Sequence, residues 1–216
     1  KVALIGRTEI LYDTAQALID SGHSIVVIIT ANEAPEYTKK SNDFAQLAHK
    51  LGIPFDCGNN IEKFRNKLLE TKAEVGVSMN YTSIISQSII DIFPYGILNA
   101  HGGDLPRYRG NACQAWAILN GETKIGLCIH KMIGGELDSG DIIARDFFSI
   151  DNNTKITKVW QWMNECTPFL MRGAVEKLEE NPNYVLEHQS KEAKDSLRCY
   201  SRKPEDGRIN WTNSAV

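Results

Sequence analysis

Short, mostly apolar runs recur along the first hundred residues and alternate with segments of helical spacing. The runs stand at residues 1–6, 24–30, 74–79 and 95–101. Between the first two, Leu11, Ala15, Leu18 and Ile19 repeat at the spacing of a helix that buries one face. Runs that are apolar at nearly every position are typical of strands buried on both faces of a parallel sheet. The pattern therefore predicts an α/β fold with a mostly parallel sheet flanked by helices.

The second half of the chain carries a different pattern. Two strand-like runs at residues 124–132 and 141–150 flank the acidic loop 134–141, which predicts an antiparallel pair. Residues 155–179 read as a long helix that Pro168 is expected to kink or split. The stretch from 199 to 211 is polar and rich in turn residues, so we interpret it as a linker.

Composition narrows the possible functions. The 216 residues carry a formal charge of -3, which gives no general attraction to nucleic acid, and we predict no nucleic-acid partner. No apolar run reaches the ~20 residues of a membrane span, and no signal peptide is visible. The five cysteines form no Cys-x-x-Cys pair, which indicates neither a disulfide framework nor a zinc site. We therefore expect a cytoplasmic protein.

Asn99 and His101 stand two apart where an apolar run gives way to a glycine-proline loop. Side chains two apart on a strand share a face, and ligands bind at the carboxyl ends of strands in such sheets. An imidazole can accept a proton while an amide stabilises developing negative charge, as acyl-type transfer requires. We expect Gly102 and Gly103 to let the backbone approach a ligand closely. A packing role for the pair is the alternative.

Asp138, in the loop "ELDSGD", is the next candidate, and Asp141 competes with it. A carboxylate beside His101 would raise the pKa of the imidazole and orient its ring. His130 lies among apolar neighbours, so we interpret it as a core residue or a support for the site, not as a catalytic group. No cluster of His, Cys, Asp and Glu has the spacing of metal ligands, and we assign no metal.

The turn "GRTEIL" after the first run has one glycine, so it fails as a dinucleotide-binding fingerprint. Arg7 and Thr8 in this turn could meet an anionic group at a helix N-terminus, or could form an ordinary charged turn. The loop "DLPRYRG" carries Arg107, Tyr108 and Arg109, which could shape a substrate rim or simply be solvated.

Three longer stretches resemble the formyltransferases that use 10-formyltetrahydrofolate. They read "LNAHGGDLPRYRGNACQAWAILNGE", "IGLCIHKMIGGELDSGDII" and "RKPEDGRINW". The resemblance implies a Rossmann-like formyltransferase fold, with a catalytic domain over residues 1–180. Residues 181–216 would be the start of a C-terminal extension that is truncated here. The family's catalytic trio of Asn, His and Asp falls on Asn99, His101 and Asp138.

The resemblance also implies where ligands lie. The pterin of 10-formyltetrahydrofolate is expected between residues 79–85 and the loop 134–138. The residues implied to bind this co-substrate are Met79, Tyr81, Ile84, Leu105, Gly134 and Leu137. A nucleotide is expected across the rim, toward Arg7 and Tyr108, with Arg202 pairing with phosphate and Trp211 stacking a base.

Within this family, the sequence of these stretches is most similar to that of the sugar N-formyltransferases, which formylate the amine of a nucleotide-linked amino sugar. We expect dTDP-4-amino-4,6-dideoxyglucose, for O-antigen or lipopolysaccharide synthesis, as acceptor, and a homodimer; a 3-amino or a UDP-linked sugar stays open. Methionyl-tRNA formyltransferases usually read "HPSLLPRYRG" where this chain reads "HGGDLPRYRG". Glycinamide ribonucleotide enzymes have a glycine- and serine-rich loop in place of "GRTEIL".

Two further alternatives are a formyltetrahydrofolate hydrolase and a folate- or nucleotide-binding module without catalysis. The hydrolase typically carries an N-terminal regulatory domain, whereas this chain begins with the first predicted strand. A binding module would have no reason to combine Asn99, His101 and Asp138.

Overall fold

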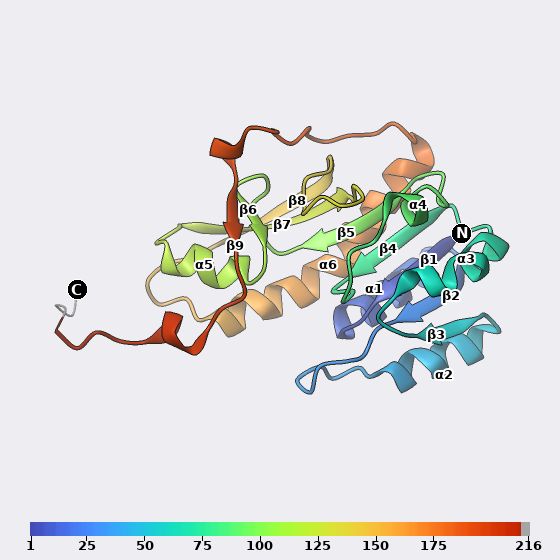
Figure 1. Cartoon of the computed structure of the whole chain (residues 1–216), viewed down its shortest axis with the longest axis horizontal. Helices are drawn as coiled ribbons and strands as arrows, with labels where there is room; N and C mark the ends of the chain where they lie inside the picture. The colour runs from blue at the N-terminus through green and yellow to red at the C-terminus, as the bar shows by residue number, and fades with distance from the viewer. Residues whose placement is uncertain (213–216) are drawn as a thin grey trace.

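A seven-stranded sheet forms the centre of the protein in the computed structural model, which describes residues 1–212 (Figure 1). The strands follow the order β3-β2-β1-β4-β5-β7-β8. The first five in this order are parallel, and β7 and β8 are antiparallel to their neighbours. Their bounds are β1 Val2–Gly6, β2 Ile25–Thr30, β3 Phe55–Cys57, β4 Val75–Met79, β5 Ile97–His101, β7 Lys124–Lys131 and β8 Ile142–Ser149. The predicted α/β fold with a mostly parallel sheet is confirmed.

Helices cover both faces of this sheet, as the apolar runs predict (Figure 1). On one face, Val2 and Leu4 of β1 pack in the same cluster as residues of α1, α2 and α6. On the other, Ala3 and Ile5 pack with residues of α3 and α4. The helices are α1 Glu9–Asp20, α2 Ser41–Leu51, α3 Arg65–Thr71, α4 Gln87–Ile90, α5 Cys113–Leu119 and α6 Ile156–Glu180, with a 3₁₀ turn at η1 Ile61–Phe64. None of the helices within residues 1–212 combines the length and the apolarity that crossing a bilayer requires.

Helix α6 continues through Pro168 and is not split there, contrary to one of the two predicted outcomes. A proline has no N–H to donate to the carbonyl four residues earlier, here that of Asn164. The Thr167 hydroxyl donates to the Met163 carbonyl at 2.6 Å. Pro168 and Thr167 are buried in the helix, so packing outweighs the missing hydrogen bond.

A short strand ends where the predicted linker begins. β9, Leu197–Cys199, shares only Cys199 with the stretch 199–211, and it pairs in parallel with β6, Tyr108–Gly110, outside the main sheet. Figure 1 shows the segment after α6 returning across the molecule to place β9 beside β6. Short 3₁₀ turns precede and follow β9, at η2 Ala193–Asp195 and η3 Pro204–Gly207. A three-residue strand in a polar stretch has no periodicity to reveal it. The division at residue 180 stays a prediction, and residues 213–216 of the predicted extension lie outside the described part.

The strand ends place the predicted site. Met79 is the last residue of β4, whereas Asn99 lies in the middle of β5, two residues before its end at His101. The antiparallel neighbour β7 pairs His130 with Asn99. Directly opposed residues of two strands point to the same face of a sheet. The topology therefore gives Asn99, His101 and His130 one common face.

Candidate active site

A cleft of about 800 Å³ opens along the carboxyl ends of the parallel strands. The start of α1, the segment after β4, the end of β5, the start of α5, the loop after β7 and the middle of α6 all contribute to its wall. Of the residues predicted for the site, the lining includes Met79, Tyr81, Ile84, Asn99, His101, Leu137 and Asp138.

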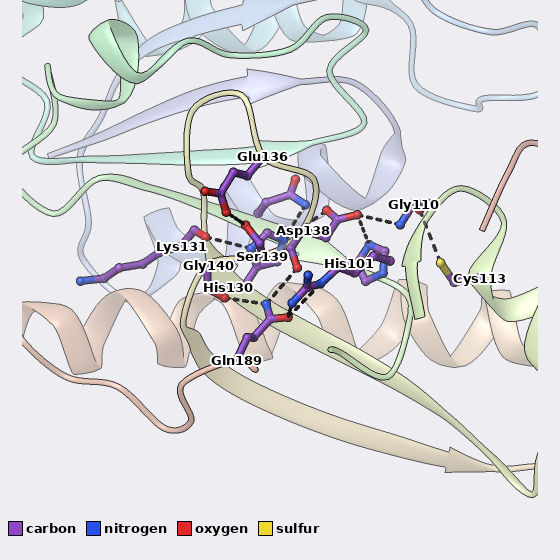
Figure 2. Close-up of polar contacts among 12 residues, drawn as sticks. His101, Gly110, Cys113, His130, Lys131, Glu136, Asp138, Ser139, Gly140 and Gln189 are labelled. Carbon is purple, nitrogen blue, oxygen red and sulfur yellow. Dashed lines mark hydrogen bonds and ion pairs between the residues drawn. The ribbon is translucent and has the colours of Figure 1, made fainter. Parts of the chain in front are cut away.

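Asp138 lies between the two histidines of this cleft (Figure 2). One carboxylate oxygen, Oδ2, is 3.4 Å from His101 Nδ1, and Oδ1 is 3.5 Å from His130 Nε2. The Gly110 N–H donates to Oδ2 at 2.9 Å. The Asn99 amide nitrogen is 3.3 Å from His130 Nε2. The predicted trio thus converges, and His130 joins it.

The His101 ring has a fixed orientation. Its Nε2 is 2.7 Å from the Tyr108 carbonyl oxygen, which can only accept, so Nε2 carries the hydrogen and donates it. A Cβ added to Gly103 would come within 2.5 Å of His101 Nε2 and 2.6 Å of the Tyr108 oxygen. The absence of a side chain at Gly103 therefore makes room for this hydrogen bond. Nδ1, facing Asp138, is the ring nitrogen left for proton transfer.

Burial sets the charge states of this pair. Burial is the largest influence on His101 and lowers the pKa of its imidazole, outweighing the opposite effect of Asp138. Asp138 does raise the pKa of His101, as expected of a carboxylate beside it, but the desolvation of the buried ring outweighs this effect. Burial also raises the pKa of Asp138, but His101, His130 and the Gly110 N–H together hold it well below its usual range. The surroundings thus favour the ionised form of Asp138, while burial favours the neutral form of the His101 imidazole.

His130 orients the amide of Asn99. Its Nδ1 donates to the carbonyl of Lys131 at 2.9 Å, so in the neutral ring Nε2 is the acceptor. Nε2 then accepts from the Asn99 amide nitrogen. His130 is almost completely buried. Its geometry is that of a residue that acts on the site through Asn99 and Asp138.

The loop after β7 aims Asp138 by a tight backbone turn. Asp138 has φ 48°, in the left-handed region that Asp tolerates better than most residues. A Cβ added to Gly140 would come within 1.9 Å of the Lys131 carbonyl oxygen, so the loop closes directly against the end of β7. The competing Asp141 instead accepts from His188 Nδ1 at 2.9 Å on the exposed side of the loop.

Several predicted ligand contacts lie elsewhere. Leu105, 1% exposed, packs with Cys128 and Ile142 and does not line the cleft. The buried Tyr108 directs its hydroxyl to Glu122 at 2.6 Å, so only its carbonyl reaches the site, through His101. The structure thus does not bring these two side chains to the cleft, because a loop sequence does not reveal which side chains point inward.

The first loop and the last segment also differ from expectation. Arg7 donates to the carbonyls of Asn80 and Asn32 and so ties two loops together behind the cleft wall. Gly134 likewise stands outside the lining, its N–H donating to the Gln87 side chain. The side chains of Arg202 and Trp211 are exposed, and Trp211 is 86% exposed. Figure 1 shows the last segment of the chain extending out from the rest of the molecule. None of the four lines the cleft.

One contribution to the wall was missed from sequence. Trp160, Met163, Asn164 and Thr167 line the cleft from one face of α6, at three- and four-residue spacing. Residues 155–179 were predicted as a helix, but their sequence did not indicate which face would meet the cleft. At the start of α1, Thr8, named from sequence beside Arg7, lines the cleft and is 2% exposed, with φ 94°. Its hydroxyl has no hydrogen-bond partner. Within residues 1–212 no group of His, Cys, Asp and Glu could hold a metal ion.

Known structures share this fold over most of the chain. A Helicobacter canadensis N-formyltransferase, solved with folinic acid and dTDP-3-aminofucose, is 18% identical and gives a TM-score of 0.73, covering 100% of this chain and 76% of its own. A Shewanella sugar N-formyltransferase is 16% identical (TM-score 0.71), with coverage of 100% and 82%. Bacillus halodurans phosphoribosylglycinamide formyltransferase is 18% identical (TM-score 0.68), with coverage of 87% and 100%. The formyl transferase family itself matches residues 1–173, and the chain therefore belongs to the formyl transferase family.

Proposed function

We propose that this protein transfers the formyl group of 10-formyltetrahydrofolate to the amine of a nucleotide-linked amino sugar. The observation that carries the proposal is the convergence of Asn99, His101 and Asp138 on one cleft, in a chain of the formyl transferase family. The Helicobacter canadensis structure, with folinic acid and dTDP-3-aminofucose, supports both substrate classes.

In the proposed reaction each group of the trio has one role. A neutral amine attacks the formyl carbon, and His101 Nδ1 takes the proton that the new C–N bond releases, directly or through a water. Asp138, 3.4 Å away, stabilises the imidazolium that results. The Asn99 amide donates to the oxygen that becomes negative. When the bond to the folate nitrogen breaks, His101 returns the proton to that nitrogen.

The apolar part of the cleft suits the pterin of the folate. Met79 is buried, and Tyr81 directs its hydroxyl to the Gly58 carbonyl at 2.7 Å, which leaves the ring to the cleft. Ile84 is 81% exposed and Leu137 45% exposed, so both offer apolar surface that a ligand would cover. These four residues are our proposed folate contacts.

The acceptor would then lie between α1 and α6. No Lys or Arg lines the cleft in the part of the chain that the structure describes. A phosphate group would therefore meet the N-terminus of α1, where Thr8 presents its unpaired hydroxyl. Trp160, 56% exposed on α6, offers a flat surface for a sugar or base. Because no side-chain cation lines the cleft, we expect specificity to depend on shape and hydrogen bonds.

A panel of acceptors tests the proposal. The protein is incubated with 10-formyltetrahydrofolate and dTDP- or UDP-linked 4-amino and 3-amino sugars, and formylated product is measured by mass spectrometry. dTDP-4-amino-4,6-dideoxyglucose is our first expectation, consistent with a role in O-antigen or lipopolysaccharide synthesis. The homodimer and the cytoplasmic location stay predictions. Formylation of no sugar nucleotide would refute the proposal.

Glycinamide ribonucleotide is the second candidate acceptor, because phosphoribosylglycinamide formyltransferase from Bacillus halodurans matches over its whole length. It carries a phosphate monoester where a sugar nucleotide carries a diphosphate. The panel therefore includes it, together with initiator methionyl-tRNA. A reaction with 10-formyltetrahydrofolate and no acceptor is assayed for formate, because release of formate would identify a formyltetrahydrofolate hydrolase. Binding of folate with no turnover in any arm would indicate the binding module.

A further inference from the structure

The segment that follows α6 inserts one buried polar side chain beside the site. Gln189 is 7% exposed and lies beyond residues 1–173, which the family matches. Its segment is anchored on β8, because the backbones of Ile142 and Glu187 exchange hydrogen bonds of 2.9 and 3.2 Å. Gln189 therefore extends from a firmly held backbone, although it lies outside residues 1–173, which the family matches.

The amide nitrogen of Gln189 holds the loop that carries Asp138. It donates to the Asp138 carbonyl at 2.9 Å and to the Gly140 carbonyl at 2.6 Å (Figure 2). Both of its hydrogens are thereby used on one turn of backbone. That turn contains the left-handed Asp138, a conformation that persists only where the surroundings enforce it.

The amide oxygen of Gln189 is held in turn by Arg109. The guanidinium donates to Gln189 Oε1 from Nη2 at 2.9 Å and from Nε at 3.3 Å. Since a guanidinium can only donate, this contact fixes which end of the amide faces the loop. The next residue, Gly110, donates its N–H to the Asp138 carboxylate. The contacts close a ring from Arg109 through Gln189 to Asp138 and back to Gly110.

We infer that Gln189 is a positioning residue, which holds the Asp138 loop so that the carboxylate stays against His101 and His130. The inference rests on the proposed function for its catalytic consequence. A misplacement of about 1 Å at a reacting group can cost on the order of a hundred-fold in rate. Gln189 touches neither the cleft nor His101, so it would act only through the loop.

Gln189→Glu tests the two hydrogen bonds that Gln189 donates to the loop. The carboxylate keeps the size of the side chain and the contact with Arg109, but it cannot donate to the two loop carbonyls. We expect kcat to fall at least ten-fold while the KM of both substrates stays within two-fold. Glu192→Gln is the matched control, because it removes an exposed 2.7 Å ion pair with Lys194 from the same segment. Its kcat should stay within two-fold of wild type.

Hydrogen exchange of the amides in residues 134–142 gives a readout that needs no substrate. We expect exchange at least ten-fold faster in Gln189→Glu and unchanged in Glu192→Gln. Gln189→Met, of similar length with neither donor nor acceptor amide, replaces Gln189→Glu if that variant does not fold. Wild-type exchange, wild-type kcat, a loss confined to KM, or an equal loss in the control would each overturn the inference. If the wild-type protein formylates no acceptor, the proposed function fails, and exchange alone still decides whether Gln189 holds the loop.

Discussion

Asp138→Asn isolates the charge of the carboxylate from its shape. The new side chain has the same size, and its oxygen, at the position of Oδ2, can still accept from the Gly110 N–H. The amide nitrogen then takes the place of Oδ1, on the side of His130. The substitution removes the negative charge that stabilises the His101 imidazolium. The variant therefore weakens His101 as a proton acceptor without emptying the site.

The distance sets the expected size of the effect. Two charges about 4 Å apart interact by about 4 kcal/mol at an effective dielectric constant of about 20. The 3.4 Å separation of Asp138 Oδ2 and His101 Nδ1 falls in this range. That free energy corresponds to roughly a thousand-fold in rate, and mobility and water would reduce it, so we expect a loss of about a hundred- to a thousand-fold in kcat.

The assay compares kcat with folate binding. Formylated product is quantified by mass spectrometry, and calorimetry measures the Kd of a stable formyl-folate analogue, which should stay within about three-fold of wild type. Asp141→Asn is the matched control, because Asp141 contacts His188 on the exposed side of the same loop. A kcat within three-fold of wild type in folded Asp138→Asn would refute the proposed role of the carboxylate.

Three further predictions rest on single contacts. Gly103→Ala should lower kcat at least ten-fold because its Cβ would displace the His101–Tyr108 hydrogen bond, whereas Gly173→Ala, whose Cβ would meet nothing within 4 Å, should keep wild-type kcat. Thr8→Gly should raise the free energy of unfolding by about 1 kcal/mol in denaturant titrations, because it relieves the φ of 94°, and should raise the KM of the acceptor. Finally, the free energy of unfolding should fall between pH 7 and pH 5: the pKa of His101 is lower in the folded state than its ordinary 6.5, so the unfolded chain binds the proton first. His101→Asn should flatten this slope, and an unchanged slope would contradict the burial argument.

The helices and strands that could be predicted are those whose packing requires a regular pattern of apolar residues in the sequence. β1 is buried at every position, and its residues alternate between the two core clusters, so an unbroken apolar run was a sufficient signal. The pairing of Asn99 and His101 on one face followed from their spacing alone. β9 and Gln189 left no such signal, because each depends on contacts with residues that are distant in sequence.

Side-chain direction was the other limit. Tyr108 and Arg7 are large polar residues in loops beside the site, and sequence indicated them as ligand contacts. In the structure each uses its polar atoms on the protein itself, Tyr108 on Glu122 and Arg7 on two carbonyls. A loop has no fixed alternation of faces, so its residue types predict that a site is near but not which groups enter it.

The reversal of strand direction at β7 explains why the site needs a strained loop. Because β7 is antiparallel to β5, its last residue, Lys131, lies beside Leu98, near the start of β5 and away from His101. The loop after β7 therefore begins beside the start of β5. It must extend to His101 at the end of β5 and then come back to the end of β7. It begins beside Ile97, where the Met132 N–H bonds, and it ends with Gly140 against the Lys131 carbonyl.

Asp138 is the residue of this loop that meets the imidazole, with its Oδ2 3.4 Å from His101 Nδ1. Asp138 has a left-handed backbone, and the Gln189 amide and the Gly110 N–H hold it from two sides. The same reversal pairs His130 with Asn99, which brings the second imidazole to the amide and to the carboxylate. One change of strand direction thus determines both why His130 joins the trio and why the carboxylate must be positioned by residues from outside its own loop.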